Sequence, residues 1–142
     1  MNDRQLIELY RSIRTIASVG ISSSPEKESF HITLYLLGQG YQIIPVNPTA
    51  GEIHGQKAYP DLLSIPEKVD VVQIFRRPED VPPVVDQAIQ IGARVAWMQV
   101  GVVNEAAAKK AESAGLIVVM DRCMRAEHIR LFGTKPRKLF KF

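Results

Sequence analysis

Five short apolar runs, rich in β-branched residues and separated by stretches with helical character, constrain the fold of this chain most strongly. They lie at 15–21, 41–47, 69–75, 94–100 and 115–121. None alternates cleanly between apolar and polar residues, which is typical of strands that are covered on both faces. Strands of this kind, alternating with helices, predict a parallel sheet with right-handed crossover connections.

The segments between these runs predict helices. They combine apolar residues at helical spacing with proline or asparagine near the start and glycine at the end. These helices are expected at about 2–13, from Phe30 to Gly38 or Gly40, from Pro78 to Gly92, from Asn104 to Gly115, and at about 124–131. The connection between 41–47 and 69–75 is rich in turn residues and has room for one short helix, at about 60–64.

The alternation predicts the α/β class, as a Rossmann-like, doubly wound sheet of five parallel strands in a single domain. We infer the strand order 3-2-1-4-5, numbered along the chain, which places the topological switch between the first and fourth strands. A ligand is then expected at the carboxyl ends of the first, second and fourth strands. All 142 residues are expected to form one domain, with its core at about 14–131 and a basic tail at 135–142.

The positive charge of the chain is local. The net charge is +3, but the tail at 135–142 holds four basic residues and no acidic one, which leaves 14 basic and 15 acidic residues at 1–134. Nucleic-acid binding is therefore not expected. The longest apolar runs fall short of the roughly 18 residues that span a membrane, the N-terminal segment is charged, and Cys123 is the single cysteine. These features predict a cytoplasmic protein with no membrane contact and no internal disulfide.

The segment VGISSSPEKESF, residues 19–30, connects a predicted strand to a predicted helix, where nucleotide-binding α/β proteins hold phosphate. Gly20 is its single glycine, so the turn is wider than the three-glycine fingerprint of dinucleotide sites. Backbone N–H groups at the helix start, the hydroxyls of Ser22 and its neighbours, and the charge of Lys27 could bind phosphate. The serines could equally serve only as helix caps.

Two further strand ends favour a phosphorylated ligand other than NAD. An NAD site has an acidic residue after the second strand to accept from the ribose hydroxyls, and this chain has Asn47 in the sequence PVNP there. Asn47 could also be a plain turn former. The third strand ends in FRRP, and we expect Arg76 rather than Arg77 to face a ligand, because a guanidinium binds phosphate through paired hydrogen bonds. The site is expected to be cationic and free of carboxylates.

Together the motifs VGISSSPEKESF, GYQIIPVNP, VDVVQIFRRPEDVPPVV, AWMQVG and VVMDRCMRAEH resemble those of the small stand-alone CoA-binding proteins. That family is similar to the CoA-binding domain of the succinyl-CoA synthetase α subunit, and the match runs from about residue 14 to 131. The resemblance implies a Rossmann-like domain that binds coenzyme A or acyl-CoA. It implies that Gly20, Ser22 and Lys27 contact the phosphates and that Val46, Asn47 and Pro48 line the nucleotide. Phe75 and Arg76 would lie along the cofactor, with Gln99 and Gly101 on its other side.

The synthetases carry their phosphorylatable histidine in a separate domain that has no counterpart here, so we expect binding without catalysis, in a sensor or carrier role. Two alternatives stay open. Cys123, with arginines and His128 nearby in sequence, could carry out acyl or thiol transfer with CoA. An NAD(P)-sensing module would keep the fold and change the ligand. Metal binding by His31, His54 and His128 is not expected, because no pair has ligand spacing.

The predicted first helix has an apolar face formed by Leu6, Ile7, Leu9 and Ile13. Such a face must be buried against another surface. It could cover the sheet, or it could contact a second copy of the chain in a homo-oligomer.

Overall fold

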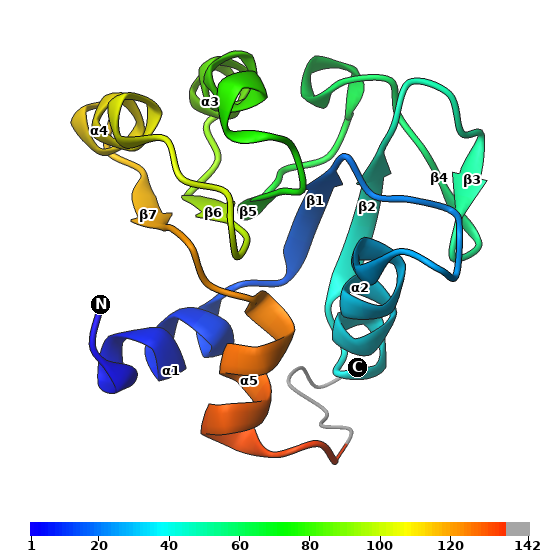
Figure 1. The fold of residues 1–142 in the computed structure, drawn as a ribbon, viewed down its shortest axis with the longest axis horizontal. Coiled ribbons are helices and arrows are strands. Elements are labelled where there is room, and N and C mark those ends of the chain that lie inside the picture. Colours follow the sequence, from blue (N-terminus) through cyan, green and yellow to red (C-terminus); the bar gives the residue numbers. More distant parts are fainter. Residues whose placement is uncertain (136–142) are drawn as a thin grey trace.

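A five-stranded parallel sheet forms the centre of the computed structural model, which describes residues 1–135. The predicted basic tail therefore lies outside the described residues, apart from Lys135. The strands are β1 (Thr15–Val19), β2 (Gln42–Val46), β5 (Val71–Ile74), β6 (Val95–Met98) and β7 (Ile117–Val119). They lie in the order β2-β1-β5-β6-β7 (Figure 1). Each neighbouring pair is parallel, so all five carboxyl ends meet at one edge of the sheet.

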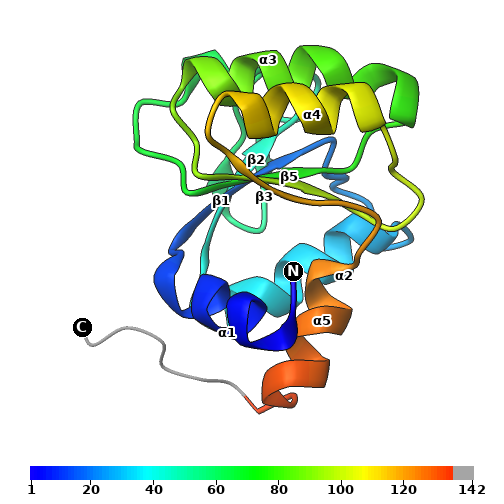
Figure 2. The ribbon, with the colours of Figure 1, turned by 90° about the vertical axis from the view of Figure 1, so that its left-hand side faces the viewer.

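Helices cover both faces of the sheet, as Figure 2 shows. They are α1 (Asp3–Ser12), α2 (Glu28–Gly38), α3 (Val81–Gln90), α4 (Glu105–Ser113) and α5 (Met124–Phe132), with short 3-10 helices η1 (Leu62–Ser64) and η2 (Pro78–Asp80). The helices α3 and α4 lie on one face, and α1, α2 and α5 lie on the other. A small hairpin of β3 (Glu52–Ile53) and β4 (Gln56–Lys57), which the sequence patterns do not predict, follows β2.

The predicted Rossmann-like α/β class is confirmed, and the strand order corresponds to the predicted one when a short bridge is counted. Val46 at the end of β2 forms an isolated parallel bridge with Tyr59. With this bridge as the third strand, the order becomes 3-2-1-4-5, and β7 follows as the sixth. The predicted position of 69–75, as the edge strand beside 41–47, is wrong. Tyr59 of the turn-rich connection takes that edge position, and 69–75 forms β5 beside β1. The topological switch therefore lies between β1 and β5.

This correction brings together two strand ends that the predicted order separates. The segment after β1 begins with Gly20, and the segment after β5 contains Phe75 and Arg76. Because β1 and β5 are direct neighbours, these two segments lie side by side at the carboxyl edge of the sheet. In doubly wound α/β folds this is the edge at which ligands bind.

The first helix covers the sheet. Leu6, Leu9 and Ile13 are buried in one hydrophobic cluster with Val95 and Trp97 of β6. The apolar face of α1 is therefore occupied within the chain, which removes the need for a second copy to bury it. Within residues 1–135, no helix combines the length and the apolar character needed to cross a membrane.

Candidate functional site

Gly20 is the point at which the ends of three strands meet. Its N–H donates to the carbonyl oxygen of Val46 (3.0 Å), and the N–H of Phe75 donates to the carbonyl oxygen of Val19 (2.8 Å). Gly20 has a positive φ of 85°, and a Cβ at this position would lie 2.5 Å from the carbonyl oxygen of Phe75. Both features exclude a larger residue, since side chains rarely adopt this φ and the space is filled by backbone.

The serines that follow Gly20 stabilise their own loop. The N–H of Ser22 donates to Oγ of Ser29 (2.9 Å), and the N–H of Ser24 donates to Oγ of Ser22 (3.0 Å). Both donors lie in the loop, and α2 has Lys27 at its N-cap with no side-chain cap bond, so these serines do not cap the helix as one of the two sequence-based alternatives expected. Lys27 occupies the N-cap position of α2 and is exposed, and no ion pair holds its side chain within the described residues. The charge of Lys27 is therefore available at the helix start.

Asn47 ties the end of β2 to the loop after β1. Its Nδ2 donates to the carbonyl oxygen of Ile21 (2.9 Å), and its Oδ1 accepts from the N–H and the hydroxyl of Thr49 (2.9 Å each) and from the N–H of Ala50 (3.3 Å). This is more than the role of a plain turn former. An aspartate here could not make the bond to Ile21, because a carboxylate has no donor. The neighbouring Pro48 is exposed.

A hollow of about 160 Å³ opens at the ends of β1 and β2, and we name it the Arg76 hollow. Its wall consists of Val19, Val46, Pro60, Asp61, Leu62, Arg76, Pro83, Val84 and Gln87. Arg76 is half-buried in this wall and takes part in no ion pair with residues 1–135. Arg77, in contrast, is exposed and pairs with Asp80 (3.1 Å) and Glu79 (3.4 Å). Of the two arginines, Arg76 has the cationic group near a hollow.

A second hollow, of about 340 Å³, lies where β5 and β6 end beneath the start of α2 and α5, and we name it the Cys123 hollow. Glu28, Ile32, Phe75, Gln99, Val100 and Cys123 line it. Phe75 and Arg76 are consecutive residues, yet they line different hollows. The segment that packs against Gly20 therefore separates the two spaces.

The Cys123 hollow ends on a row of buried polar side chains from three neighbouring strands. Ser18 of β1 and Gln73 of β5 are in register and fully buried, and Gln99, which follows β6, is 5% exposed. Oγ of Ser18 donates to Oε1 of Gln73 (2.8 Å), and Nε2 of Gln73 donates to Oε1 of Gln99 (3.3 Å). Ser18 and Gln73 are missing from the predicted site. The signal was present, because each is a polar residue in the middle of a largely apolar run.

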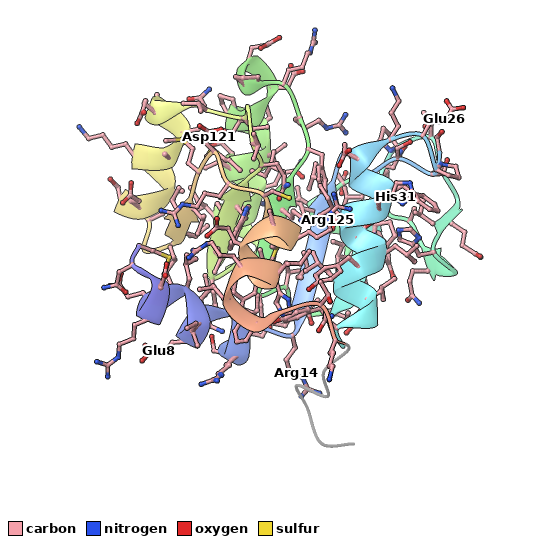
Figure 3. The ribbon with its side chains drawn as sticks, turned by 60° about the horizontal axis from the view of Figure 1, so that its bottom comes forward. Glu8, Arg14, Glu26, His31, Asp121 and Arg125 are labelled. Atoms are coloured by element: carbon pink, nitrogen blue, oxygen red, sulfur yellow. The ribbon has the colours of Figure 1, made fainter. Side chains whose placement is uncertain are left out.

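The structure corrects the expectation that the site has no carboxylates. Glu28 lines the Cys123 hollow and pairs with Arg125 of α5 (3.3 Å), which lies between α5 and α2 (Figure 3). Asp61 lines the Arg76 hollow, and its Oδ1 accepts from the N–H (2.9 Å) and the hydroxyl (2.7 Å) of Ser64. Each carboxylate is engaged by a donor of the chain itself, so the negative charge near both hollows is partly compensated.

Four of the ten predicted positions line the hollows, namely Val46, Arg76, Phe75 and Gln99. Gly101 is one of the other six. It is exposed, lines neither hollow, and its N–H donates to Oδ1 of Asp121 (2.8 Å). Its positive φ of 82° indicates a backbone role in the turn after β6. Gly20, Ser22, Lys27, Asn47 and Pro48 also line neither hollow, and they lie in the segments that follow β1 and β2.

Cys123 lies at the N-cap of α5, where its Sγ accepts from the N–H of Ala126 (3.5 Å) and its side chain is half-buried in the wall of the hollow. The apolar run before Cys123 suggests that this residue ends a buried strand, but β7 ends at Val119 and Cys123 begins the next helix. His128 is fully buried, and its Nδ1 is hydrogen-bonded to the hydroxyl of Tyr35 (2.8 Å) on the core side of α5.

The other two histidines take part in local contacts. His31 is hydrogen-bonded to the carbonyl oxygen of Pro25, and Nε2 of His54 is hydrogen-bonded to Oγ1 of Thr33 (2.8 Å). Across residues 1–135, no three His, Cys, Asp or Glu side chains converge in a group that could hold a metal ion.

The fold is a Rossmann-like α/β domain, and the two hollows at the carboxyl edge of its sheet, on either side of the switch point, form a candidate ligand site. A family model described as CoA binding domain matches residues 14–129, and the chain belongs to that family. The predicted resemblance is thereby confirmed. Uncharacterized protein YneT of Bacillus subtilis (strain 168) is 37% identical over 124 residues, which are 87% of this chain and 92% of that protein.

Longer relatives contain the same domain. Acetate–CoA ligase [ADP-forming] II of Archaeoglobus fulgidus is 31% identical over 122 residues, which are 84% of this chain but only 18% of the ligase. Among solved structures, a hypothetical protein from Pyrococcus horikoshii OT3 superposes with a TM-score of 0.91 at 44% identity, over 94% of each chain. The fold is therefore shared by small proteins of this length and by one part of a much larger ligase.

Proposed function

We propose that this protein binds coenzyme A, or an acyl-CoA, across the two hollows and carries out no reaction on it, acting as a sensor or carrier. The observation that carries the proposal is the arrangement of Phe75 and Arg76 beside Gly20. These consecutive residues line two different spaces, one with a cationic group that forms no ion pair within residues 1–135 and one with largely apolar walls. Coenzyme A has two matching ends, a phosphorylated nucleotide and an uncharged thiol arm.

The nucleotide end fits the Arg76 hollow. The guanidinium of Arg76 can bind two phosphate oxygens at once, and it forms no ion pair with a carboxylate within the described residues. The loop after Gly20, with Lys27 at the start of α2, supplies further positive character for the pyrophosphate. Asn47 stands where NAD sites have an acid and is held by the Ile21 carbonyl group, which favours CoA over NAD.

The thiol arm fits the Cys123 hollow. Ile32, Phe75 and Val100 make its wall largely apolar, and Gln99 supplies an amide at its buried end. Ligand sites of this type combine apolar walls with a few placed polar groups. A ligand that binds in both hollows would pass over Gly20, where the strand ends meet.

A thermal-shift panel with CoA, NAD, NADP and FMN tests the proposal. A ligand present at about 100 times its dissociation constant stabilises the folded state by about 2.7 kcal/mol, which raises the unfolding temperature by several degrees in a domain of this size. We expect this shift with CoA and not with NAD. A shift with NADP and none with CoA would instead support the NAD(P)-sensing alternative.

A second candidate function rests on the position of Cys123, whose thiol lines the same hollow as the proposed thiol arm. The Cys123 thiolate could attack the carbonyl carbon of an acyl-CoA, so that the acyl group passes to Sγ and CoA leaves as its thiolate. Intact-protein mass spectrometry after incubation with acetyl-CoA tests this step. An acetyl adduct that is absent in Cys123→Ser would support transfer, and no adduct in the wild type would leave binding alone.

A further inference from the structure

The side-chain amide of Gln99 has one defined orientation. Its Oε1 accepts from the N–H of Met124 (3.2 Å) and from Nε2 of Gln73 (3.3 Å). A backbone N–H can only donate, so the oxygen of Gln99 must face Met124 and the NH₂ group must face the other way. Gln99 lines the Cys123 hollow, and within residues 1–135 its Nε2 has no hydrogen-bond partner.

The residues behind Gln99 hold this orientation. Oε1 of Gln73 accepts from the hydroxyl of Ser18 (2.8 Å), which leaves Nε2 of Gln73 as the donor toward Gln99 and toward Sδ of Met124 (3.7 Å). Ser18 and Gln73 are fully buried, so water does not compete for these bonds. The row is therefore satisfied inside the protein and ends in one donor that faces the hollow.

Nε2 of Gln99 opens onto the hollow, whose other walls offer mainly apolar groups, so a ligand that fills the hollow without an acceptor leaves this donor unpaired and away from water, which is costly. A ligand that places an acceptor there would be favoured. The thiol of free CoA is a weak acceptor, whereas the carbonyl oxygen of a thioester is a good one. The hollow, at about 340 Å³, lies at the small end of ligand sites and suits a short acyl group.

We propose that Gln99 recognises the carbonyl oxygen of a short-chain acyl-CoA thioester, so that the protein binds acyl-CoA in preference to free CoA. Gln73 acts as a positioning residue that keeps the Gln99 amide oriented as a donor. This inference rests on the proposed function and specifies its ligand. It requires no chemical step.

Calorimetric titration of acetyl-CoA and of CoA tests the inference through the ratio of the two affinities. The wild type is expected to bind acetyl-CoA about 3-fold to 10-fold more tightly, the range of one net hydrogen bond. Gln99→Leu and Gln73→Leu should bring the ratio close to one. Gln99→Glu keeps an acceptor for Met124 but presents an oxygen to the ligand carbonyl, so it should invert the ratio. This variant tests the inference even if the leucine variants do not fold.

The matched control is Gln39→Leu. Gln39 is 2% exposed and lies at the C-cap of α2, at the opposite end of that helix from the hollow, so this variant should keep the wild-type ratio. If the wild type binds CoA and acetyl-CoA equally well, or if Gln99→Leu leaves the ratio of the two affinities unchanged, the inference is overturned while the proposed function stands. If neither ligand binds, both fail. Equal weakening of both ligands in Gln99→Leu would place the amide against the pantetheine arm and would also overturn the inference.

Discussion

The backbone of Phe75 lies so close to Gly20 that the two residues together define the centre of the site. A Cβ on Gly20 would approach the Phe75 carbonyl oxygen to 2.5 Å and Cδ of Arg76 to 3.3 Å. The first contact involves backbone that β5 holds in place through the bond from Phe75 N–H to Val19. The side chains of Phe75 and Arg76 diverge from this point into the two hollows.

Replacing Gly20 by alanine should therefore destabilise the protein and weaken CoA binding together. The positive φ costs about 1–2 kcal/mol and the displaced backbone adds to it, so we expect a loss of about 3 kcal/mol or more in the free energy of unfolding. Urea denaturation measures this loss. Gly92→Ala is the control, because Gly92 has a similar φ of 73° with nothing within 4 Å of a Cβ. An equal loss in both variants would contradict the close approach.

Arg76→Gln should weaken CoA binding with little effect on stability. A charge-assisted hydrogen bond contributes about 1.5–3 kcal/mol, so the dissociation constant should rise roughly 10-fold to 100-fold in calorimetric titrations. Arg77→Gln is the control, since Arg77 is exposed and paired with Asp80 and Glu79. If the Arg77 variant loses more affinity than the Arg76 variant, the phosphates bind elsewhere.

Asn47→Asp should lower both stability and CoA affinity, because it places a carboxylate oxygen against the carbonyl oxygen of Ile21. We expect a loss of about 1–3 kcal/mol in the free energy of unfolding. Asn104→Asp loses the same kind of bond, to the carbonyl oxygen of Pro78 (2.9 Å), away from the Gly20 loop. It should be destabilised but keep its affinity for CoA. Unchanged CoA binding in Asn47→Asp would separate Asn47 from the site.

The stability of the fold should fall at mildly acidic pH through His54. Burial, and to a smaller extent the charge of His31, lower the pKa of His54 below its ordinary value, although a hydrogen bond to the Phe30 backbone opposes this. The unfolded chain then binds a proton more readily than the folded one. The contribution of neutral His54 to the free energy of unfolding is therefore fully present above about pH 6.5 and is lost as pH falls through the folded pKa.

His54→Asn removes this titration and suits the backbone, because asparagine tolerates the positive φ of 56° at this position. Denaturation curves recorded between about pH 7.5 and pH 5 should show a flatter decline for the variant than for the wild type. A decline of equal slope in both proteins would show that His54 does not contribute to it.

Most of the fold follows from local patterns. The apolar runs became β1, β2, β5, β6 and β7 because a parallel strand covered on both faces needs apolar residues throughout. The order of strands depends on contacts distant in the sequence, which is why the edge role of Tyr59 and the place of β5 beside β1 could not be predicted from the runs alone.

The site was predictable where a residue type has one main use. Gly20 adopts a positive φ that glycine accommodates easily, and Arg76 lines a hollow at the strand ends. The Ser18 and Gln73 pair was missed because its partner Gln99 joins it only through the register of three strands. Pattern analysis identifies a polar residue in an apolar run but not the neighbour that satisfies it.

Chemical-shift mapping of isotope-labelled protein by NMR, during titration with CoA, tests the central claim most directly. If CoA crosses Gly20 and reaches both hollows, the largest changes should affect the backbone amides of Gly20, Phe75, Arg76 and Gln99, with smaller changes along α2. Changes confined to another surface, such as the groove between α1 and Arg94 at the opposite edge of the sheet, would contradict the account, as would no change at a saturating concentration of CoA.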